Sequence, residues 1–260
     1  MTQPLSPSTA LPRPGLRLDA VNRGALLSAY FPVGDPLIPT DRLAIYARAR
    51  VDIVELGLKA VNAFADGPVV AGSMARAHGE GRVGEARRAA LTLRGQDPAI
   101  TAMAFGYAEP TLMDAGTDWQ VIDALLCLGE PAPRRRIEAE ATAQGVRRVC
   151  FLTYDFDEAD IERAAGAEGF VFLQYSPGLT GLRDDLDPAL SARLRRLRQG
   201  GVARPIVAGI GVSTPDQMRH ALDAGADGIV VGSMTVLKAL EGPAALEEYL
   251  MQTRAVVDGG

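Results

Sequence analysis

The chain has 260 residues, of which 47% are hydrophobic and 23% are charged, with a formal net charge of −5 at pH 7. This length and hydrophobic content are enough for one barrel-sized domain with a full core. The acidic balance gives no overall attraction to nucleic acid or to an anionic membrane, so a small-molecule substrate is expected. No apolar run reaches the ~18 residues that span a bilayer, and no basic and apolar leader precedes the first strand, so we expect a cytoplasmic protein.

Cysteine and histidine are too sparse to favour a metal centre. Cys127 and Cys150 lie in apolar runs that are typical of strands, where cysteine commonly serves as a small core residue. The chain has two histidines, His78 and His220, so we expect no zinc site.

The N-terminal segment differs in composition from the rest of the chain. Residues 1–12 are rich in proline, serine and threonine and carry no periodicity, so a disordered tail is expected over residues 1–14. Residues 15–260 are expected to form a single catalytic domain.

Short apolar runs then alternate with longer amphipathic stretches, which is the pattern of parallel strands joined by crossover helices. The apolar runs predict eight strands, at residues 25–31, 50–56, 99–105, 122–128, 148–153, 169–175, 204–208 and 228–231. Helices are expected between them, at 42–50, 71–94, 138–144, 158–165, 188–199 and 215–224. Eight such units predict an α/β fold, the (β/α)8 TIM barrel, whose active sites lie at the carboxyl ends of the strands.

Two carboxylates lie at the end of the second expected strand and in the loop after it. Glu55 stands near the carboxyl end of the strand, and Asp66 opens the turn sequence Asp66-Gly67-Pro68 in the loop. Side chains placed in this way can face one cavity and move protons there. The alternative is that Asp66 only caps a turn and that Glu55 is a solvated strand end.

Glycine follows each of the last three expected strands, in Gly178-Leu179-Thr180-Gly181, Gly209-Ile210-Gly211 and Gly232-Ser233. Backbone amides approach an anion closely only where no side chain intervenes, and a helix after Ser233 would direct its positive amino end at that anion. Barrels commonly build a phosphate site from these loops. Glycine also serves in ordinary tight turns, but the joint positions favour a phosphate site.

Six segments occur in a distinctive order: Phe31-Pro32-Val33-Gly34-Asp35-Pro36, Glu55-Leu56-Gly57, Ala65-Asp66-Gly67-Pro68, Gly178-Leu179-Thr180-Gly181, Gly209-Ile210-Gly211-Val212-Ser213 and Gly232-Ser233. In order and in much of their spacing they resemble the tryptophan synthase alpha subunits. The resemblance runs from about Ala25 to the C-terminus and includes the step of eleven residues from Glu55 to Asp66.

The resemblance implies a barrel that cleaves indole-3-glycerol phosphate to indole and glyceraldehyde 3-phosphate. It implies that Glu55 and Asp66 are the catalytic pair and that Thr180 helps to orient the aspartate. The remaining matched positions are the pocket aromatics Tyr107 and Phe172 and the phosphate-binding residues Gly181, Gly211, Gly232 and Ser233.

These residue types suit the chemistry. To make indole a leaving group, carbon 3 of the ring must gain a proton, the ring N–H must be stabilised by a carboxylate, and the neighbouring hydroxyl must lose its proton. Glu55 would donate the proton and later accept one from the hydroxyl, while Asp66 would contact the N–H. Glu55 then needs a raised pKa, which desolvation in an apolar barrel mouth provides. The reaction requires no metal and no organic cofactor.

The sequence also departs from the family. Between the two carboxylates the family usually has Pro-Phe-Ser-Asp-Pro, but this chain has Lys59-Ala60-Val61-Asn62-Ala63. The stretch from Pro110 to Ile122 is too short for a family-length third helix, which predicts a shortened third βα unit. Gly129 replaces a usual aspartate, and Tyr175-Ser176 replaces Ser-Arg before the lid loop. Three of these changes fall on the barrel face that meets the beta subunit in the family.

Several functional hypotheses remain open. We favour a free-standing lyase that releases indole in a specialised pathway, without the beta partner. The alternatives are a retro-aldol or aldol enzyme for another phosphorylated compound, an alpha subunit that depends on a pyridoxal phosphate-containing beta partner, and a non-catalytic binding relative. The run Arg134-Arg135-Arg136 could bind an additional anionic group, although a solvated helix start is the commoner explanation.

Overall fold

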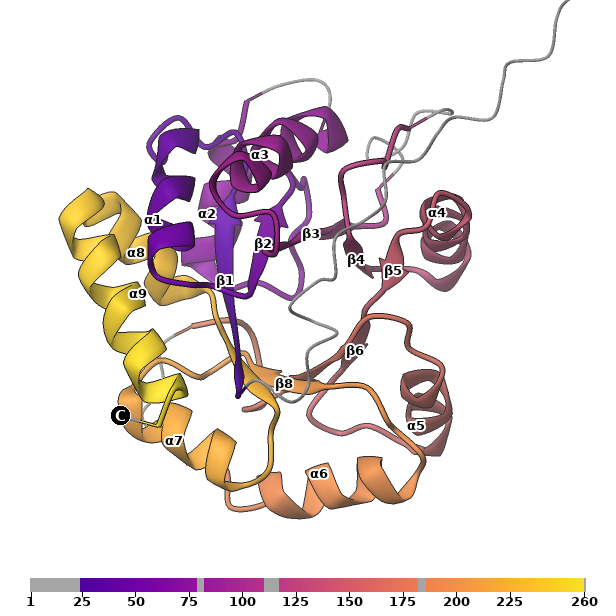
Figure 1. Ribbon diagram of the computed structural model, residues 1–260. Coiled ribbons are helices and arrows are strands. Elements are labelled where there is room, and N and C mark those ends of the chain that lie inside the picture. Colours follow the sequence, from indigo (N-terminus) through magenta and orange to yellow (C-terminus); the bar gives the residue numbers. More distant parts are fainter. Residues whose placement is uncertain (1–23, 79–81, 110–116, 182–185, 260) are drawn as a thin grey trace, which may run out of the picture.

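The computed structural model describes residues 24–78, 82–109, 117–181 and 186–259, so the tail expected over residues 1–14 lies outside the described residues. Within these ranges the chain forms a sheet in which every pairing is parallel, surrounded by helices (Figure 1). The strands are β1 Leu26–Pro32, β2 Ile53–Gly57, β3 Thr101–Tyr107, β4 Ala124–Leu128, β5 Arg147–Arg148, β6 Cys150–Leu152, β7 Val171–Gln174, β8 Ile206–Gly209 and β9 Gly228–Val231.

The sheet closes at the fifth predicted strand. Its first half, β5, pairs with β4, and its second half, β6, pairs with β7. Around Val149 the backbone changes partner, because the Val149 N–H donates to Leu125 O at 2.9 Å and the Cys150 N–H donates to Phe170 O at 3.1 Å. The strand order β5-β4-β3-β2-β1-β9-β8-β7-β6 is therefore that of a TIM barrel, as the sequence predicts.

The strand register sets which side chains point into the barrel. Tyr30 of β1 lies opposite Glu55 of β2, and Glu55 lies opposite Met103 of β3. Since side chains alternate along a strand, Ser28 lies on the same face as Tyr30 and Glu55. Glu55 occupies the middle of β2, two residues before the strand ends at Gly57. It therefore lies deeper in the barrel than the position at the carboxyl end of the strand that the sequence predicts.

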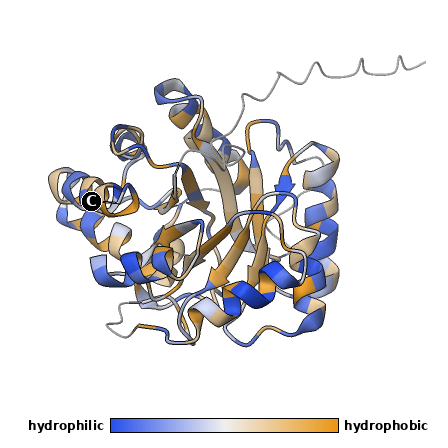
Figure 2. Ribbon diagram, turned by 60° about the horizontal axis from the view of Figure 1, so that its bottom comes forward, coloured by the Kyte–Doolittle hydropathy of each residue, from blue (hydrophilic) through white to orange (hydrophobic). Residues whose placement is uncertain are grey.

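The helices form a ring outside the sheet, with hydrophilic residues on their outer faces and the apolar strands at the centre (Figure 2). None of the described helices is both long and apolar enough to cross a lipid bilayer. They are η2 Thr40–Arg42, α1 Leu43–Arg48, α2 Pro68–Arg76, α3 Arg82–Gln96, α4 Pro131–Ala143, α5 Glu158–Ala165, α6 Leu190–Gln199, α7 Pro215–Asp223, α8 Ser233–Glu241 and α9 Pro243–Val257.

Two helix predictions need correction. The single helix expected over residues 71–94 is wrong, because α2 ends before Ala77, whose ψ of 132° leaves the helical region, and the His78 N–H bonds to Gly34 O instead. The helix expected at 138–144 begins earlier, at Pro131. Proline is well suited to the first turn of a helix, where its missing N–H has no intrahelical partner.

The third βα unit is short, as predicted. The connection from β3 to β4 is described over residues 117–123, directly before β4, and these residues contain no helix. Gln144, at the end of α4, holds this segment by accepting from the Trp119 N–H and donating to Thr117 O. The Trp119 side chain is buried in the hydrophobic core, so this segment packs against the barrel.

Candidate active site

Glu55 is a buried carboxyl group inside the barrel. Only 3% of the residue is exposed, and the hydroxyl group of Ser28 on β1 donates to its Oε1 at 2.9 Å. The pKa of Glu55 is raised to about 8, mainly by burial and to a smaller extent by the nearby charge of Asp66, while the bond from Ser28 opposes the shift. At neutral pH Glu55 is therefore mainly protonated and can donate a proton.

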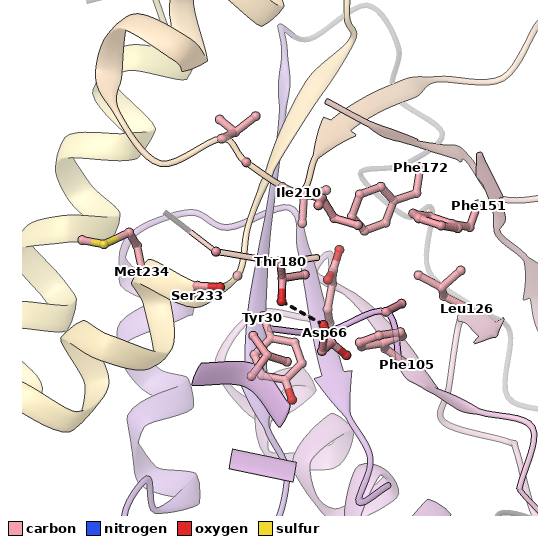
Figure 3. A pocket seen from close by; sticks show the side chains of 18 of the residues that line it. Tyr30, Asp66, Phe105, Leu126, Phe151, Phe172, Thr180, Ile210, Ser233 and Met234 are labelled. Atoms are coloured by element: carbon pink, nitrogen blue, oxygen red, sulfur yellow. Dashed lines mark hydrogen bonds between the residues drawn. The ribbon is translucent and has the colours of Figure 1, made fainter. Parts of the chain in front are cut away.

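Asp66 lies in the loop between β2 and α2 and faces the same cavity as Glu55 (Figure 3). The Tyr107 hydroxyl donates to its Oδ2 at 2.5 Å, and the Thr180 hydroxyl donates to its Oδ1 at 3.2 Å. Burial raises the pKa of Asp66 to about 6, and both hydroxyl groups oppose that shift. Asp66 is therefore mainly ionised at neutral pH, so the two carboxyl groups of one cavity have different protonation states.

The loop after β7 packs closely against the loop that carries Asp66. The Gly67 N–H donates to Thr180 Oγ1 at 2.7 Å, so Thr180 links the two loops. A Cβ atom at Gly67 would lie 1.9 Å from the backbone oxygen of Thr180. Only glycine permits this approach, which places the Thr180 hydroxyl beside the aspartate.

The cavity that contains Glu55 and Asp66, here called the carboxylate cavity, has an apolar side and a polar side. In Figure 3, Phe151, Phe172 and Leu126 lie on one side, Ser233 and Met234 lie on the other, and Asp66 lies between them. The apolar lining comes mainly from strands β1, β3, β4, β6 and β7, through Tyr30, Phe105, Leu126, Leu128, Phe151 and Phe172. Such a wall suits a flat aromatic ring.

The polar side is built by the loops after β7, β8 and β9. Gly181, Gly211, Gly232 and Ser233 all line the carboxylate cavity. Gly232 is the N-cap of α8 and has no side chain to accept from the first-turn amides, so these amides remain available to an anion. Gly211 has a φ of +100°, a conformation that favours glycine. The arrangement can therefore hold a phosphate group by backbone amides and the helix dipole.

A second cavity adjoins the carboxylate cavity. Four residues line both: Ala65, Leu128, Phe151 and Ile210. Tyr107 lines the second cavity, although its hydroxyl reaches Asp66. The Tyr107 ring is in edge contact with Phe64 from the loop after β2, with ring centroids 4.9 Å apart.

The structure brings all nine sequence-predicted site residues to these adjoining cavities. Eight line the carboxylate cavity, and Tyr107 reaches it through its bond to Asp66. The sequence analysis missed Ser28, whose role depends on strand register, and Tyr30, which lies beside Glu55 in that register. The period-2 alternation of β1 could have indicated that Ser28 and Tyr30 face inward. Among the described residues no cluster of histidine, cysteine or acidic side chains could hold a metal ion.

Comparison with known proteins reveals extensive similarity. A family model described as "Tryptophan synthase alpha chain" matches residues 17–258. The tryptophan synthase alpha chain of Halalkalibacterium halodurans is 31% identical over 256 residues, covering 94% of each protein. That of Geobacter sulfurreducens is 33% identical over 230 residues, covering 83% of this chain and 84% of that protein.

Solved structures show the same fold at lower sequence identity. A structure of Mycobacterium tuberculosis tryptophan synthase matches with a TM-score of 0.78 and 23% identity, covering 95% of this chain and all of that chain. A mutant tryptophan synthase alpha-subunit from Pyrococcus furiosus matches with a TM-score of 0.73 and 22% identity, covering 91% and 98% of the two chains.

Proposed function

Because this chain belongs to the tryptophan synthase alpha family, we propose that it is a carbon–carbon lyase that cleaves indole-3-glycerol phosphate to indole and glyceraldehyde 3-phosphate. The activity resides in a single barrel domain, residues 15–260. The observation that carries the proposal is the difference in pKa between the two buried carboxyl groups, about 8 for Glu55 and about 6 for Asp66, in a cavity that also contains phosphate-type loops.

Glu55 and Asp66 divide the proton transfers. Glu55 donates its proton to carbon 3 of the indole ring, while the ionised Asp66 accepts a hydrogen bond from the ring N–H and stabilises the positive charge that develops there. The bond from carbon 3 to the glycerol chain then breaks, and its electron pair returns to the ring. The adjacent hydroxyl becomes the aldehyde as its proton passes to Glu55, which restores the starting carboxylic acid.

Substrate orientation follows from the two sides of the cavity. The phosphate group is held by the amides around Gly181, Gly211, Gly232 and Ser233, and the ring lies against Phe172 and its apolar neighbours. Thr180 and Tyr107 hold the aspartate in place for the ring N–H. Binding energy from the phosphate end thereby positions the reacting carbon between the two carboxyl groups.

We also propose that the enzyme works without a beta subunit, in a specialised pathway. Two observations support this proposal. The acid, the base and the phosphate loops all come from this one chain, and the altered loop between the carboxylates is held by the chain itself. Lys59 Nζ donates to Ala77 O at 2.6 Å, and the Glu109 carboxylate accepts from the N–H groups of Val61 and Asn62.

The family also supports a second candidate, an alpha subunit that acts together with a beta subunit. Indole release from indole-3-glycerol phosphate separates the candidates when it is measured with the purified chain alone and after a tryptophan synthase beta subunit is added. If the purified chain releases indole alone, and the rate rises less than threefold when the beta subunit is added, the result supports the free-standing lyase. Turnover only on addition supports the paired subunit, and no turnover in either case points to another phosphorylated substrate or to a binding protein.

A further inference from the structure

The second cavity extends the site beyond the groups that the proposed reaction uses. It shares the walls Ala65, Leu128, Phe151 and Ile210 with the carboxylate cavity, so the two are adjoining parts of one barrel mouth. The four shared residues are apolar, but the other residues that line the second cavity include charged side chains, among them Arg134 on the first turn of α4.

Arg134 is a cation with few partners. Its only ion pair among the described residues joins Nε to Glu138 Oε1 at 3.8 Å, which is too long for a hydrogen bond. The Nε atom is buried and makes no hydrogen bond, although the side chain as a whole is 24% exposed. A guanidinium group has five N–H donors and commonly binds a carboxylate through two of them. Arg134 is thus equipped for an acidic ligand.

The two neighbouring arginines do not share this position. Arg135 is exposed and Arg136 forms an ion pair with Glu140 at 3.2 Å, and neither lines the cavity. The helix start itself offers few donors, because Pro131 and Pro133 lack an N–H group. The anion-binding capacity of this region therefore lies in the Arg134 side chain.

The other charged groups of the second cavity are engaged or solvated. Arg163 donates to Asp160 at 2.6 Å and to Phe151 O at 3.2 Å. The Glu109 carboxylate accepts from backbone N–H groups of the loop after β2, and Glu130 is exposed, so solvent and salt screen its charge. These contacts leave Arg134 as the group best placed to meet a ligand.

Substrate orientation connects this arginine with the aromatic end of the substrate. With the phosphate near Gly232 and the ring N–H at Asp66, the aromatic end of the substrate is directed to the apolar wall, of which Leu128 and Phe151 also line the second cavity. We propose that the second cavity is a subsite for a carboxylate substituent on the benzene half of an indole ring, bound by Arg134. This proposal rests on the proposed function for the orientation of the ring.

Direct binding tests the subsite without requiring turnover. Affinities of the full chain for indole, indole-5-carboxylate and indole-6-carboxylate are measured by calorimetry, for the wild type, Arg134→Gln and the matched control Arg135→Gln. We expect at least one of the two carboxylates to bind more tightly than indole. The affinity for that carboxylate, divided by the affinity for indole, should fall at least tenfold in Arg134→Gln but not in Arg135→Gln. Thermal denaturation verifies that both variants are folded.

Two results would overturn the subsite. One is that neither carboxylate binds more tightly than indole. The other is that Arg134→Gln and Arg135→Gln show the same preference for the carboxylate over indole. The proposed lyase activity is tested separately, by cleavage of unsubstituted indole-3-glycerol phosphate by the wild type. If the carboxylate preference depends on Arg134 but the wild type does not cleave indole-3-glycerol phosphate, the subsite is supported and the proposed lyase reaction is rejected.

Discussion

The Ser28 hydroxyl donates a 2.9 Å hydrogen bond to Glu55 Oε1 from the neighbouring strand, and both side chains are buried in the barrel. Among the described residues, no other hydrogen bond to the Glu55 carboxyl group is formed. The bond fixes one carboxyl oxygen and stabilises the charged form, so Ser28 controls both the direction of Glu55 and the pH at which it loses its proton.

Replacing Ser28 with alanine should move the alkaline limb of the pH–activity profile to higher pH. The Ser28 bond lowers the pKa of Glu55, so its loss raises that pKa above about 8. Activity that needs protonated Glu55 is lost as pH rises through this pKa, and the loss therefore occurs later in the variant. A hydrogen bond to a charged group contributes about 1.5–3 kcal/mol, which predicts a shift of roughly one to two pH units. An alkaline limb that stays in place would reject this role for Ser28.

Replacing Tyr107 with phenylalanine should move the other limb. The Tyr107 hydroxyl lowers the pKa of Asp66, so the variant raises that pKa above about 6. Activity that needs ionised Asp66 then requires a higher pH, and the acidic limb of kcat/KM moves up by roughly one unit. The alkaline limb, set by Glu55, serves as the internal control. Movement of both limbs together would show that the variant disturbs the whole site.

Gly67→Ala should reduce activity while leaving the barrel folded. The added Cβ would lie 1.9 Å from Thr180 O, so the two loops must separate and the bond from Thr180 to Asp66 is lost. We expect kcat/KM to fall about tenfold or more, since a hydrogen bond to a charged group contributes about 1.5–3 kcal/mol.

Gly72→Ala, in α2, is the matched control. Its added Cβ would meet only the end of the Arg76 side chain, at 3.5 Å, so activity should be unchanged and stability should rise by roughly 0.5–1 kcal/mol. Equal kinetics for the two variants would contradict the importance of the contact between the loops.

Gly181→Asp tests the phosphate loops. A Cβ at this position meets nothing within 4 Å, so the side chain fits, but its negative charge opposes the phosphate. We expect KM for indole-3-glycerol phosphate to rise about tenfold or more. The neutral and nearly isosteric Gly181→Asn should change KM much less. A similar rise in both variants would indicate steric obstruction in place of electrostatic repulsion.

Local sequence patterns were sufficient to predict the barrel and the positions of the two carboxylates and the glycine loops. Each depends on spacing along a few neighbouring residues and on a general rule, that barrel sites lie at the carboxyl ends of strands. The break after α2 could not be predicted in this way. It depends on the bond from His78 to Gly34, which is distant in sequence.

The electrostatic details of the site also depend on tertiary contacts. Asp66 is bonded to Tyr107, 41 residues away, and to Thr180, 114 residues away. The direction of the pKa shift of Glu55 could be predicted from an apolar barrel mouth. The opposing bond from Ser28 could be predicted only from the register of β1 against β2. Periodicity predicts which residues face inward and does not predict which of them meet.

Indole release by Glu55→Gln and Asp66→Asn tests the central claim most directly. The rate of cleavage of indole-3-glycerol phosphate is compared with that of the wild type and of Glu248→Gln, an exposed control on α9. The two site variants are expected to lose about 10²- to 10⁴-fold in rate, as is typical when a general acid or base is removed, and the control should lose nothing. A site variant that retains more than about a tenth of the wild-type rate would contradict the division of proton transfers between Glu55 and Asp66.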